Sequence, residues 1–281
     1  EGEVDESYDI LVLSTGSLPF VPQLPGSDSE RIFQLWNMQD MDHILKAIEA
    51  KQAASAIVIG GGFVGLETAE NLVRKGLHVT LIEMQEQVLP SVDYELAQQA
   101  HQKLAASGIR LILGEGVTSF EERESGITVI TPKHRVDADI VITAIGVRPN
   151  SALAAGCGLA LNQRGGVIVN ASLQTSDENI YAVGDIVETT NFVTGRPAMI
   201  PLAGPANKMG RMAADNICGL GRTYRGTQGA SVVKLFDLTL ASVGLNERQL
   251  MTDGKVFGKD YYAMLVRTKD HAGYYPGAAD M

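Results

Sequence analysis

The chain has 281 residues, of which 45% are hydrophobic and 20% charged, values typical of a globular protein with room for two domains and part of a third. Its formal net charge is −10, and no dense run of Lys and Arg interrupts the acidic surplus, so nucleic-acid binding is not expected. No apolar stretch approaches the length of a membrane helix, so no contact with a membrane is expected.

The N-terminus and the cysteines indicate the cellular location of the protein and whether the chain is complete. Residues 1–5 are acidic and lack the basic and apolar regions of a signal peptide. They also lack an initiator methionine and lead almost at once into an apolar run, which suggests a chain cut from a longer one. Cys157 and Cys218 form no Cys-x-x-Cys pair, so a reduced, cytoplasmic location is expected.

A strand, a linker and a helix are predicted before the βαβ unit. Residues 8–14 predict a buried strand that leads into Thr15-Gly16-Ser17, where glycine permits close approach of the backbone. A proline-rich linker follows over 19–26. Asp40 is predicted to cap a helix that extends to about residue 50.

The βαβ unit itself spans 56–83. A β-branched strand over 56–59 leads through a glycine turn into a helix over 63–75, which Gly76 is expected to end. A second strand over 79–82 ends in Glu83. The residues expected to face inward from this helix are Val64, Leu66, Ala69, Leu72 and Val73.

The remaining elements continue the strand and helix pattern. The central block predicts, in order, a helix over 94–107, a strand over 110–113, antiparallel strands over 126–131 and 135–139, and a buried strand over 140–145 that ends at Gly146. The last block predicts strands over 165–169 and 180–183, a helix over 205–218, and strands over 230–236 and 240–243 of a different, antiparallel unit.

The glycine turn carries a dinucleotide-binding fingerprint. Gly60 permits the tight turn, Gly62 lets the backbone approach a diphosphate, and Gly65 lets the helix pack closely. The amides at the start of the helix and its dipole would bind the diphosphate. Because a strand precedes this motif and a helix follows it, we predict that it binds the ADP half of NAD.

Glu83 favours NAD over NADP. A carboxylate at the end of the second strand accepts hydrogen bonds from the ribose hydroxyls and repels a 2′-phosphate. An NADP site usually has Arg or Lys just after this position, whereas Met84 and Gln85 follow here. Glu83 considered alone also fits an acid at the solvated end of a strand.

Other polar residues leave alternatives open. Asp185, after Gly184 at the end of a strand, fits either a contact with a sugar or polyol hydroxyl or a simple turn. Lys208 and Arg211 fit either a phosphate contact or a solvated helix face. No metal site is predicted, because no metal-ligand spacing connects the histidines His43, His78, His101, His134 and His271.

Four motifs in this order resemble the FAD-dependent pyridine nucleotide-disulfide oxidoreductase family over essentially the whole chain. They are Ser14-Thr-Gly16, Gly60-Gly-Gly-Phe-Val-Gly65-Leu-Glu67, Ala144-Ile-Gly146-Val-Arg-Pro149 and Tyr181-Ala-Val-Gly184-Asp185. The stretches 201–207, 226–229 and 271–277 look most like the branch of coenzyme A-disulfide reductases, persulfide reductases and NADH oxidases.

The resemblance implies an α/β fold with several domains. A Rossmann-like NAD-binding domain over 29–147 would be inserted in a partial, discontinuous FAD-binding domain over 1–28 and 148–225. An incomplete α+β dimerisation domain would begin at 226 and continue to 281, and the intact protein would be a homodimer.

The resemblance also assigns site residues. The NAD site would comprise Gly60, Gly61, Gly62, Phe63, Val64, Gly65, Glu67, Glu83 and Gly146, with Phe63, Val64 and Glu67 near the nicotinamide. The FAD site would comprise Thr15, Gly16, Gly184, Asp185, Leu202 and Ala203, with Asp185 on the ribityl chain and the last two beside the pyrimidine ring.

The implied activity is an oxidoreductase that passes hydride from NADH through flavin to a small disulfide or persulfide of the coenzyme A type. Tyr274 or Tyr275 would face this substrate across a dimer interface. The alternative within enzymes is an NADH oxidase or peroxidase that reduces oxygen species.

Two features of the family are missing from this chain: the first Gly-x-Gly-x-x-Gly motif for FAD and the redox-active cysteine, which is expected upstream. Cys157 and Cys218 match no redox position of the family and are expected to be unreactive thiols. The chain by itself is therefore expected to be inactive and to hold FAD poorly. An alternative from another class is a nucleotide-binding fragment with no activity of its own.

Overall fold

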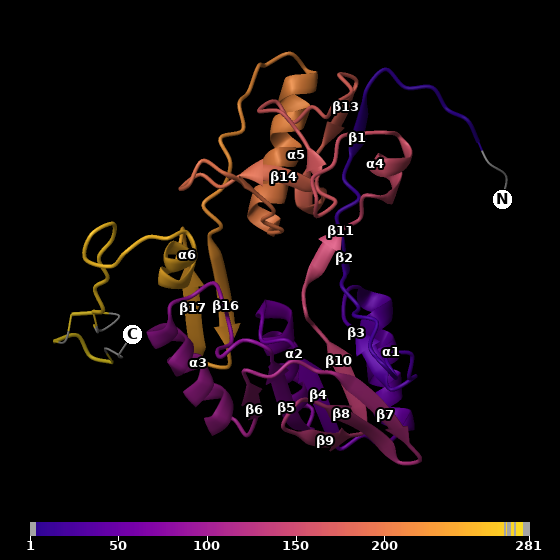
Figure 1. Cartoon of the computed structure of the whole chain (residues 1–281), viewed down its shortest axis with the longest axis vertical. Helices are drawn as coiled ribbons and strands as arrows, with labels where there is room; N and C mark the ends of the chain where they lie inside the picture. The colour runs from indigo at the N-terminus through magenta and orange to yellow at the C-terminus, as the bar shows by residue number, and fades with distance from the viewer. Residues whose placement is uncertain (1–3, 267, 269–270, 273, 278–281) are drawn as a thin grey trace. The chain divides into compact units, whose positions relative to one another are not determined.

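The computed structural model describes residues 4–266, 268, 271–272 and 274–277 (Figure 1). The chain divides into two compact units, Glu1–Gly244 and Leu245–Met281. Among the described residues, no helix combines the length and the apolar character that crossing a membrane requires.

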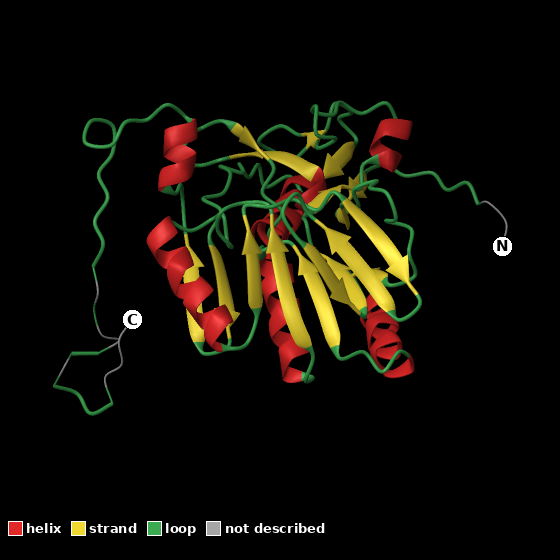
Figure 2. Cartoon of the chain, turned by 60° about the horizontal axis from the view of Figure 1, so that its bottom comes forward, coloured by secondary structure: helices red, strands yellow, loops and turns green. Residues whose placement is uncertain are grey.

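A parallel sheet organises the middle of the first unit. Its strand order is β3 (Ile32–Gln34), β10 (Ile140–Thr143), β4 (Ser55–Ile59), β5 (His78–Glu83) and β6 (Arg110–Leu113), and all neighbours are parallel (Figure 2). Three helices connect its successive strands: α1 (Met38–Ala50), α2 (Phe63–Arg74) and α3 (Tyr94–Ala106). This arrangement confirms the predicted α/β class and the βαβ unit at its centre.

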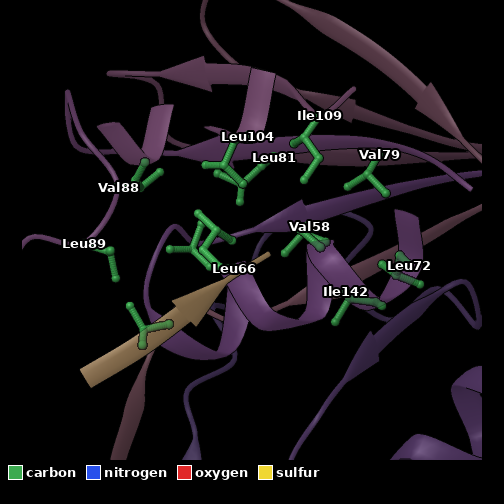
Figure 3. Packing of buried hydrophobic residues seen from close by; sticks show 14 of the residues in the cluster. Val58, Leu66, Leu72, Val79, Leu81, Val88, Leu89, Leu104, Ile109 and Ile142 are labelled. Carbon is green, nitrogen blue, oxygen red and sulfur yellow. The ribbon is translucent and has the colours of Figure 1, made fainter. Parts of the chain in front are cut away.

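The two faces of this sheet pack against different partners. In β4, Val58 points toward the face covered by α2, where it shares a buried cluster with Leu66 and Leu81 (Figure 3). Ile57, its neighbour in sequence, belongs to the cluster on the opposite face together with Val129. Such alternation follows from the two-residue period of a strand, and each buried side chain of this size contributes about 1.5–3 kcal/mol to folding.

An antiparallel sheet covers that opposite face. It consists of β7 (Ser119–Arg123), β8 (Gly126–Ile130) and β9 (Arg135–Ala138), with β8 in the middle. The antiparallel pairing of β8 and β9 was predicted, whereas β7 was missed. Most side chains of β7 are exposed and charged, so its sequence lacks a clear apolar alternation.

Short strands and two helices form the other part of the first unit. β1 (Leu11–Leu13) pairs in parallel with β13 (Ile180–Ala182), and β2 (Ser17–Pro19) pairs antiparallel with β11 (Val147–Pro149). The remaining elements are β12 (Val167–Ile168), β14 (Val187–Thr190), β15 (Pro197–Ala198), the 3-10 turn Gly184–Ile186, α4 (Ala152–Gly156) and α5 (Ala203–Ile217). Their buried side chains form a separate cluster around Ile186 and Met209.

A hairpin ends the first unit and packs against the helices of the parallel sheet. Its strands are β16 (Ser231–Leu235) and β17 (Leu238–Ser242), which are antiparallel as predicted. Their apolar side chains join the cluster around α2 and do not form the core of a different unit. At its turn, the N–H of Phe236 donates to Glu70 Oε2 of α2 at 2.8 Å. The second unit contains α6 (Glu247–Thr252), which begins with a capping box at Asn246.

Two details of the predicted helices were wrong. The N-cap of α1 is Asn37, whose side chain accepts from the N–H of Asp40 while the Asp40 carboxylate accepts from the N–H of Asn37. Asp40 is therefore the third residue of a capping box, not the cap. Val64 does not face the core: it lies in the first turn of α2, beyond the edge of the sheet, and is 48% exposed.

Asp139 ties the end of the antiparallel sheet to the start of β4. Its Oδ2 accepts hydrogen bonds from the N–H groups of Ala54 (2.9 Å) and Ser55 (2.8 Å) and from the Ser55 hydroxyl (2.8 Å). Burial disfavours the charged form, but the hydrogen bonds together outweigh it, so the pKa of Asp139 lies below its usual value.

Replacing Asp139 by Asn is expected to lower the free energy of unfolding near neutral pH by about 1–2 kcal/mol, because the three donors lose a charged acceptor. The folded-state pKa is depressed, so this contribution is present above the unfolded value of 3.8 and is lost as the pH falls through the folded value. Urea unfolding at about pH 7 and about pH 3 measures it. The exposed Asp28→Asn is the control, and equal stability of wild type and Asp139→Asn at neutral pH would contradict the prediction.

Candidate dinucleotide-binding sites

The glycine loop between β4 and α2 contains two glycines that no other residue could replace without a shift of the backbone. Gly60 has a φ of +111°, and a Cβ atom there would overlap the carbonyl oxygen of Ala144. A Cβ atom on Gly65 would overlap the carbonyl oxygen of Gly60. The obstructing atoms belong to the backbone and cannot rotate away, so both positions require glycine for this close packing.

Gly62 is different, because its surroundings are empty. A Cβ atom on Gly62 would have no atom of the described residues within 4 Å. Gly62 is also the N-cap of α2, and no described side chain caps that helix by a hydrogen bond. The open space therefore lies at free helix amides and at the positive end of the helix dipole, an arrangement that fits a diphosphate.

Glu83 lies against the glycine loop at the end of β5. Its Oε2 accepts a hydrogen bond from the N–H of Gly61 at 2.5 Å, and its Oε1 accepts from the N–H of Gln85 at 2.8 Å. The carboxylate is half-buried. A carboxylate that already reaches the loop is placed to accept hydrogen bonds from a ribose held there.

Gly146 reaches the same edge of the sheet from β10. The N–H of Ala144 donates to the carbonyl of Ile59 at 2.7 Å, which joins the ends of β10 and β4 side by side. Gly146 follows with a φ of +107° and open space at its Cβ position in the described structure. The chain leaves β4 toward β5 on one side and has β10 on the other, and such a reversal of strand order is where open α/β sheets bind ligands.

The other predicted NAD residues lie on the first two turns of α2. Phe63 is half-buried, whereas Val64 and Glu67 are exposed. All three follow directly from the glycine loop. An exposed apolar residue at this position is consistent with a contact to a bound ring.

A second edge unites the predicted FAD residues. Because β1 and β13 are parallel, the segment with Thr15 and Gly16 and the segment with Gly184 and Asp185 emerge at the same end of the pair. The hydroxyl of Ser17 donates to Asp185 Oδ2 at 3.2 Å, which fixes one oxygen of the carboxylate. The other oxygen accepts no hydrogen bond from the described part of the chain and can accept one from a ligand hydroxyl.

The start of α5 lies beside this edge. A Cβ atom on Gly184 would lie 3.8 Å from the Cβ of Ala206, in the first turn of α5. Leu202 is the N-cap of α5, Ala203 is its first residue, and no described side chain caps it. Free amides at this helix start would stabilise negative charge on a group bound beside them.

The family model of pyridine nucleotide-disulphide oxidoreductases matches residues 1–209. The chain belongs to this family. It is a family of oxidoreductases that use FAD and NAD(P)H, which agrees with the two edges described above.

Relatives of known activity cover almost the whole chain. The NAD(P)H sulfur oxidoreductase (CoA-dependent) of Pyrococcus abyssi is 34% identical over 100% of this chain and 62% of its own length. The reduced CoADR-RHD of Bacillus anthracis is 45% identical with a TM-score of 0.93, over 98% of this chain and 49% of that one. The chain thus spans less than two thirds of the length of the relatives it matches.

A third relative shows a pyridine nucleotide bound. The water-forming NADH oxidase of Lactobacillus brevis, bound to NADH, is 32% identical with a TM-score of 0.89, over 98% of this chain and 60% of that one. An engineered form with five substitutions, bound to NADPH, is 31% identical with the same TM-score and coverage.

The remaining predicted residues are two tyrosines and two cysteines. Tyr274 and Tyr275 belong to the second unit, are 85% and 58% exposed, and have ring centroids 5.5 Å apart. Their role in substrate binding stays a prediction. Cys157 and Cys218 are exposed and unpaired in the described structure. No group of His, Cys, Asp and Glu in the described residues is arranged to hold a metal ion.

Ser17 and Asn150, at the second edge, were not predicted as site residues from the sequence. The Thr15 hydroxyl donates to the carbonyl of Asn150 at 2.7 Å, and the N–H of Asn150 donates to the carbonyl of Gly16 at 2.9 Å. These bonds join two segments that are far apart in the sequence. The polar residues that follow Gly16 and Pro149 were the available signal, but their pairing depends on the antiparallel contact of β2 and β11.

Replacing Gly62 by Ala is expected to leave folding nearly intact, since the new methyl group meets open space, and to weaken NADH binding by about tenfold or more. The methyl group would occupy the space that fits the diphosphate. Fluorescence titration with NADH measures the affinity, and thermal unfolding measures the fold. Gly156→Ala, which also meets open space but lies in α4, is the matched control. Unchanged NADH affinity of Gly62→Ala would contradict the assignment.

Proposed function

We propose that this chain forms the nucleotide-binding part of a flavoenzyme that uses NADH to reduce a small disulfide or persulfide of the coenzyme A type. Bound NADH would supply a hydride, and bound FAD would accept it and pass the electrons on to sulfur. The observation that carries the proposal is the glycine loop, with open space at Gly62 and the Glu83 carboxylate beside it.

The residues of the chain would bind and orient the two cofactors. The amides of the glycine loop and the start of α2 would hold the NAD diphosphate, and Glu83 would accept from the ribose hydroxyls. Gly146 would let the nicotinamide end approach the sheet edge. At the second edge, Asp185 would accept from the ribityl chain of FAD, and the amides after Leu202 would stabilise the charge of the reduced flavin.

The substrate class rests on the relatives. The protein from Pyrococcus abyssi is CoA-dependent, and a relative from Staphylococcus haemolyticus that is 36% identical over 97% of this chain and 60% of its own length is a coenzyme A disulfide reductase. These names support a coenzyme A disulfide or persulfide as substrate. Tyr274 or Tyr275 would contact it, and the reactive cysteine would be contributed by a part of the polypeptide outside this chain.

An NADH oxidase is the second candidate. The structure from Lactobacillus brevis is a water-forming NADH oxidase, and its fold matches that of this chain closely. Both candidates use the same NAD and FAD residues, so the two sites described here do not distinguish them. They differ in what receives the electrons from the flavin.

The acceptor is tested with protein that carries this chain together with the additional length of its relatives. In air, NADH oxidation is expected to require coenzyme A disulfide or persulfide and to consume little oxygen. Absorbance of NADH and oxygen uptake, recorded in the same reaction, give the two rates. If NADH loss follows oxygen uptake and does not depend on the disulfide or persulfide, the reductase proposal is wrong and the oxidase proposal is right.

The engineered oxidase supports the choice of NAD over NADP. In the form bound to NADPH, an aspartate is replaced by alanine and the next residue by arginine. A substituted glycine precedes that aspartate by the same number of residues that separates Gly65 from Glu83, and a substituted proline follows it at the interval from Glu83 to Pro90. These matching intervals support the view that Glu83 and Met84 choose the nucleotide.

The double substitution Glu83→Ala and Met84→Arg is therefore expected to lower the affinity for NADH about tenfold and to raise that for NADPH about tenfold. Each change corresponds to roughly 1.4 kcal/mol, the scale of one charged hydrogen bond lost or gained. Titrations with both nucleotides measure the ratio. Glu86→Ala removes an exposed carboxylate nearby and should leave both affinities unchanged. A double variant that still prefers NADH would contradict the role of Glu83.

The same proposal includes the division into domains, a homodimeric intact protein and a cytoplasmic location. The separate hydrophobic clusters support an NAD-binding domain over 29–147 inserted in an FAD-binding domain over 1–28 and 148–225. A dimerisation domain would begin at 226. The exposed, unpaired thiols of Cys157 and Cys218 support a reduced cytoplasmic setting.

A further inference from the structure

The end of β5 and the segment that follows it hold Gly61, the middle residue of the glycine loop, on three sides. The N–H of Gly61 donates to Glu83 Oε2 at 2.5 Å, and its carbonyl accepts from the N–H of Leu89 at 2.8 Å. A Cβ atom on Gly61 would lie 2.9 Å from the side chain of Val88. We call Glu83, Val88 and Leu89 the Gly61 clamp.

The Gly61 clamp has a backbone conformation that needs support. Leu89 has a φ of +50°, in the left-handed region that residues other than glycine rarely adopt. Val88 and Leu89 are 0% and 1% exposed and belong to the same buried cluster as Leu66 of α2 (Figure 3). Such a conformation persists only where its surroundings hold it.

One hydrogen bond that supports the clamp comes from a different element. His101, on α3, accepts from the N–H of Val88 through Nε2 at 3.1 Å. Gln87 adds bonds from its amide to the carbonyls of Leu89 (3.5 Å) and Val92 (3.1 Å), but these stay within the segment. His101 is therefore a side chain of α3 that holds the backbone of the clamp.

An imidazole nitrogen can accept a hydrogen bond only when it carries no proton, so this contact requires the neutral form of His101. Burial lowers the pKa of His101, and within the described structure no charged neighbour contributes to the shift. The charged groups of the adjoining elements include Glu83 of the clamp, Glu86 in the segment, Asp93 and Glu95 at the start of α3, and Lys103, which pairs with Asp237 of the hairpin.

We infer that His101 is a positioning residue for the dinucleotide site: by accepting from Val88 it keeps the Gly61 clamp, and through it the glycine loop, in the conformation that binds the diphosphate. His101 touches no part of the space at Gly62 and acts only through the clamp. The inference rests on the proposed NAD-binding function of the loop.

The nucleotide affinity is expected to depend on pH, because His101 can accept from Val88 only in its unprotonated form. Protonation turns Nε2 from an acceptor into a donor that faces the N–H of Val88, so the contact is lost in the charged form. Nucleotide affinity is therefore full above the ordinary histidine value of 6.5 and falls as the pH drops through the lowered pKa of His101.

The test uses ADP-ribose as the probe, since it carries the diphosphate and adenosine of NAD and is stable in weak acid. Calorimetric titrations between about pH 5 and about pH 8 compare three proteins with the wild type. His101→Phe removes the acceptor, and His101→Gln supplies an amide oxygen that accepts without titrating. His78→Gln changes an exposed histidine at the opposite end of β5 and is the matched control.

The wild type and His78→Gln are expected to lose affinity together as the pH falls below 6.5. His101→Phe should bind about fivefold more weakly than the wild type at the upper end of the range, and with a flat pH profile, since one hydrogen bond is lost. His101→Gln should retain the affinity of the wild type and lose its decline in acid. Thermal unfolding shows whether each variant is folded.

The outcomes separate this inference from the function on which it rests. If the wild type does not bind ADP-ribose at all, the proposed NAD site is wrong. If the wild type binds and His101→Phe binds equally well, the site stands and the positioning role is overturned. A decline in acid that persists in His101→Gln also overturns it, and this arm decides the matter even if His101→Phe does not fold.

Discussion

The close approach of α2 to the glycine loop is the contact on which the first site depends. Gly65 leaves room for the carbonyl of Gly60, and Gly60 leaves room for the carbonyl of Ala144. Both obstructions are backbone atoms, so any side chain would push the helix away from the sheet. The approach brings the free amides of α2 to the carboxyl edge of β4, where the helix dipole favours an anion.

The two candidate sites obey one rule of parallel strands. At the first site, β4 and β10 end side by side, which joins the glycine loop to Gly146. At the second, β1 and β13 end side by side, which joins Gly16 to Asp185 across a long stretch of chain. Parallel pairing brings carboxyl ends to one edge, so segments remote in sequence meet there. The same geometry of parallel strands therefore forms both candidate sites.

Hydrogen-bond acceptors outside the glycine loop complete its conformation. Glu83 accepts from the loop itself, and His101 accepts from the segment that encloses it. The acceptors differ in charge: a carboxylate accepts in its ionised form, whereas an imidazole accepts only when neutral. Acid therefore weakens the contact made by His101, because protonation removes the acceptor. The loop thus takes its shape from local glycines and its rigidity from more distant residues.

The sequence by itself determined the βαβ unit, the roles of Gly60 and Gly65, and the family, because hydrophobic period and the need for glycine at a turn are local properties. It did not predict β7, the position of Asn37 as the N-cap of α1 in place of Asp40, or the exposure of Val64. Only the tertiary structure paired Ser17 with Asp185 and His101 with Val88. These contacts join different elements, and their distances depend on how whole strands and helices pack, which no local pattern encodes.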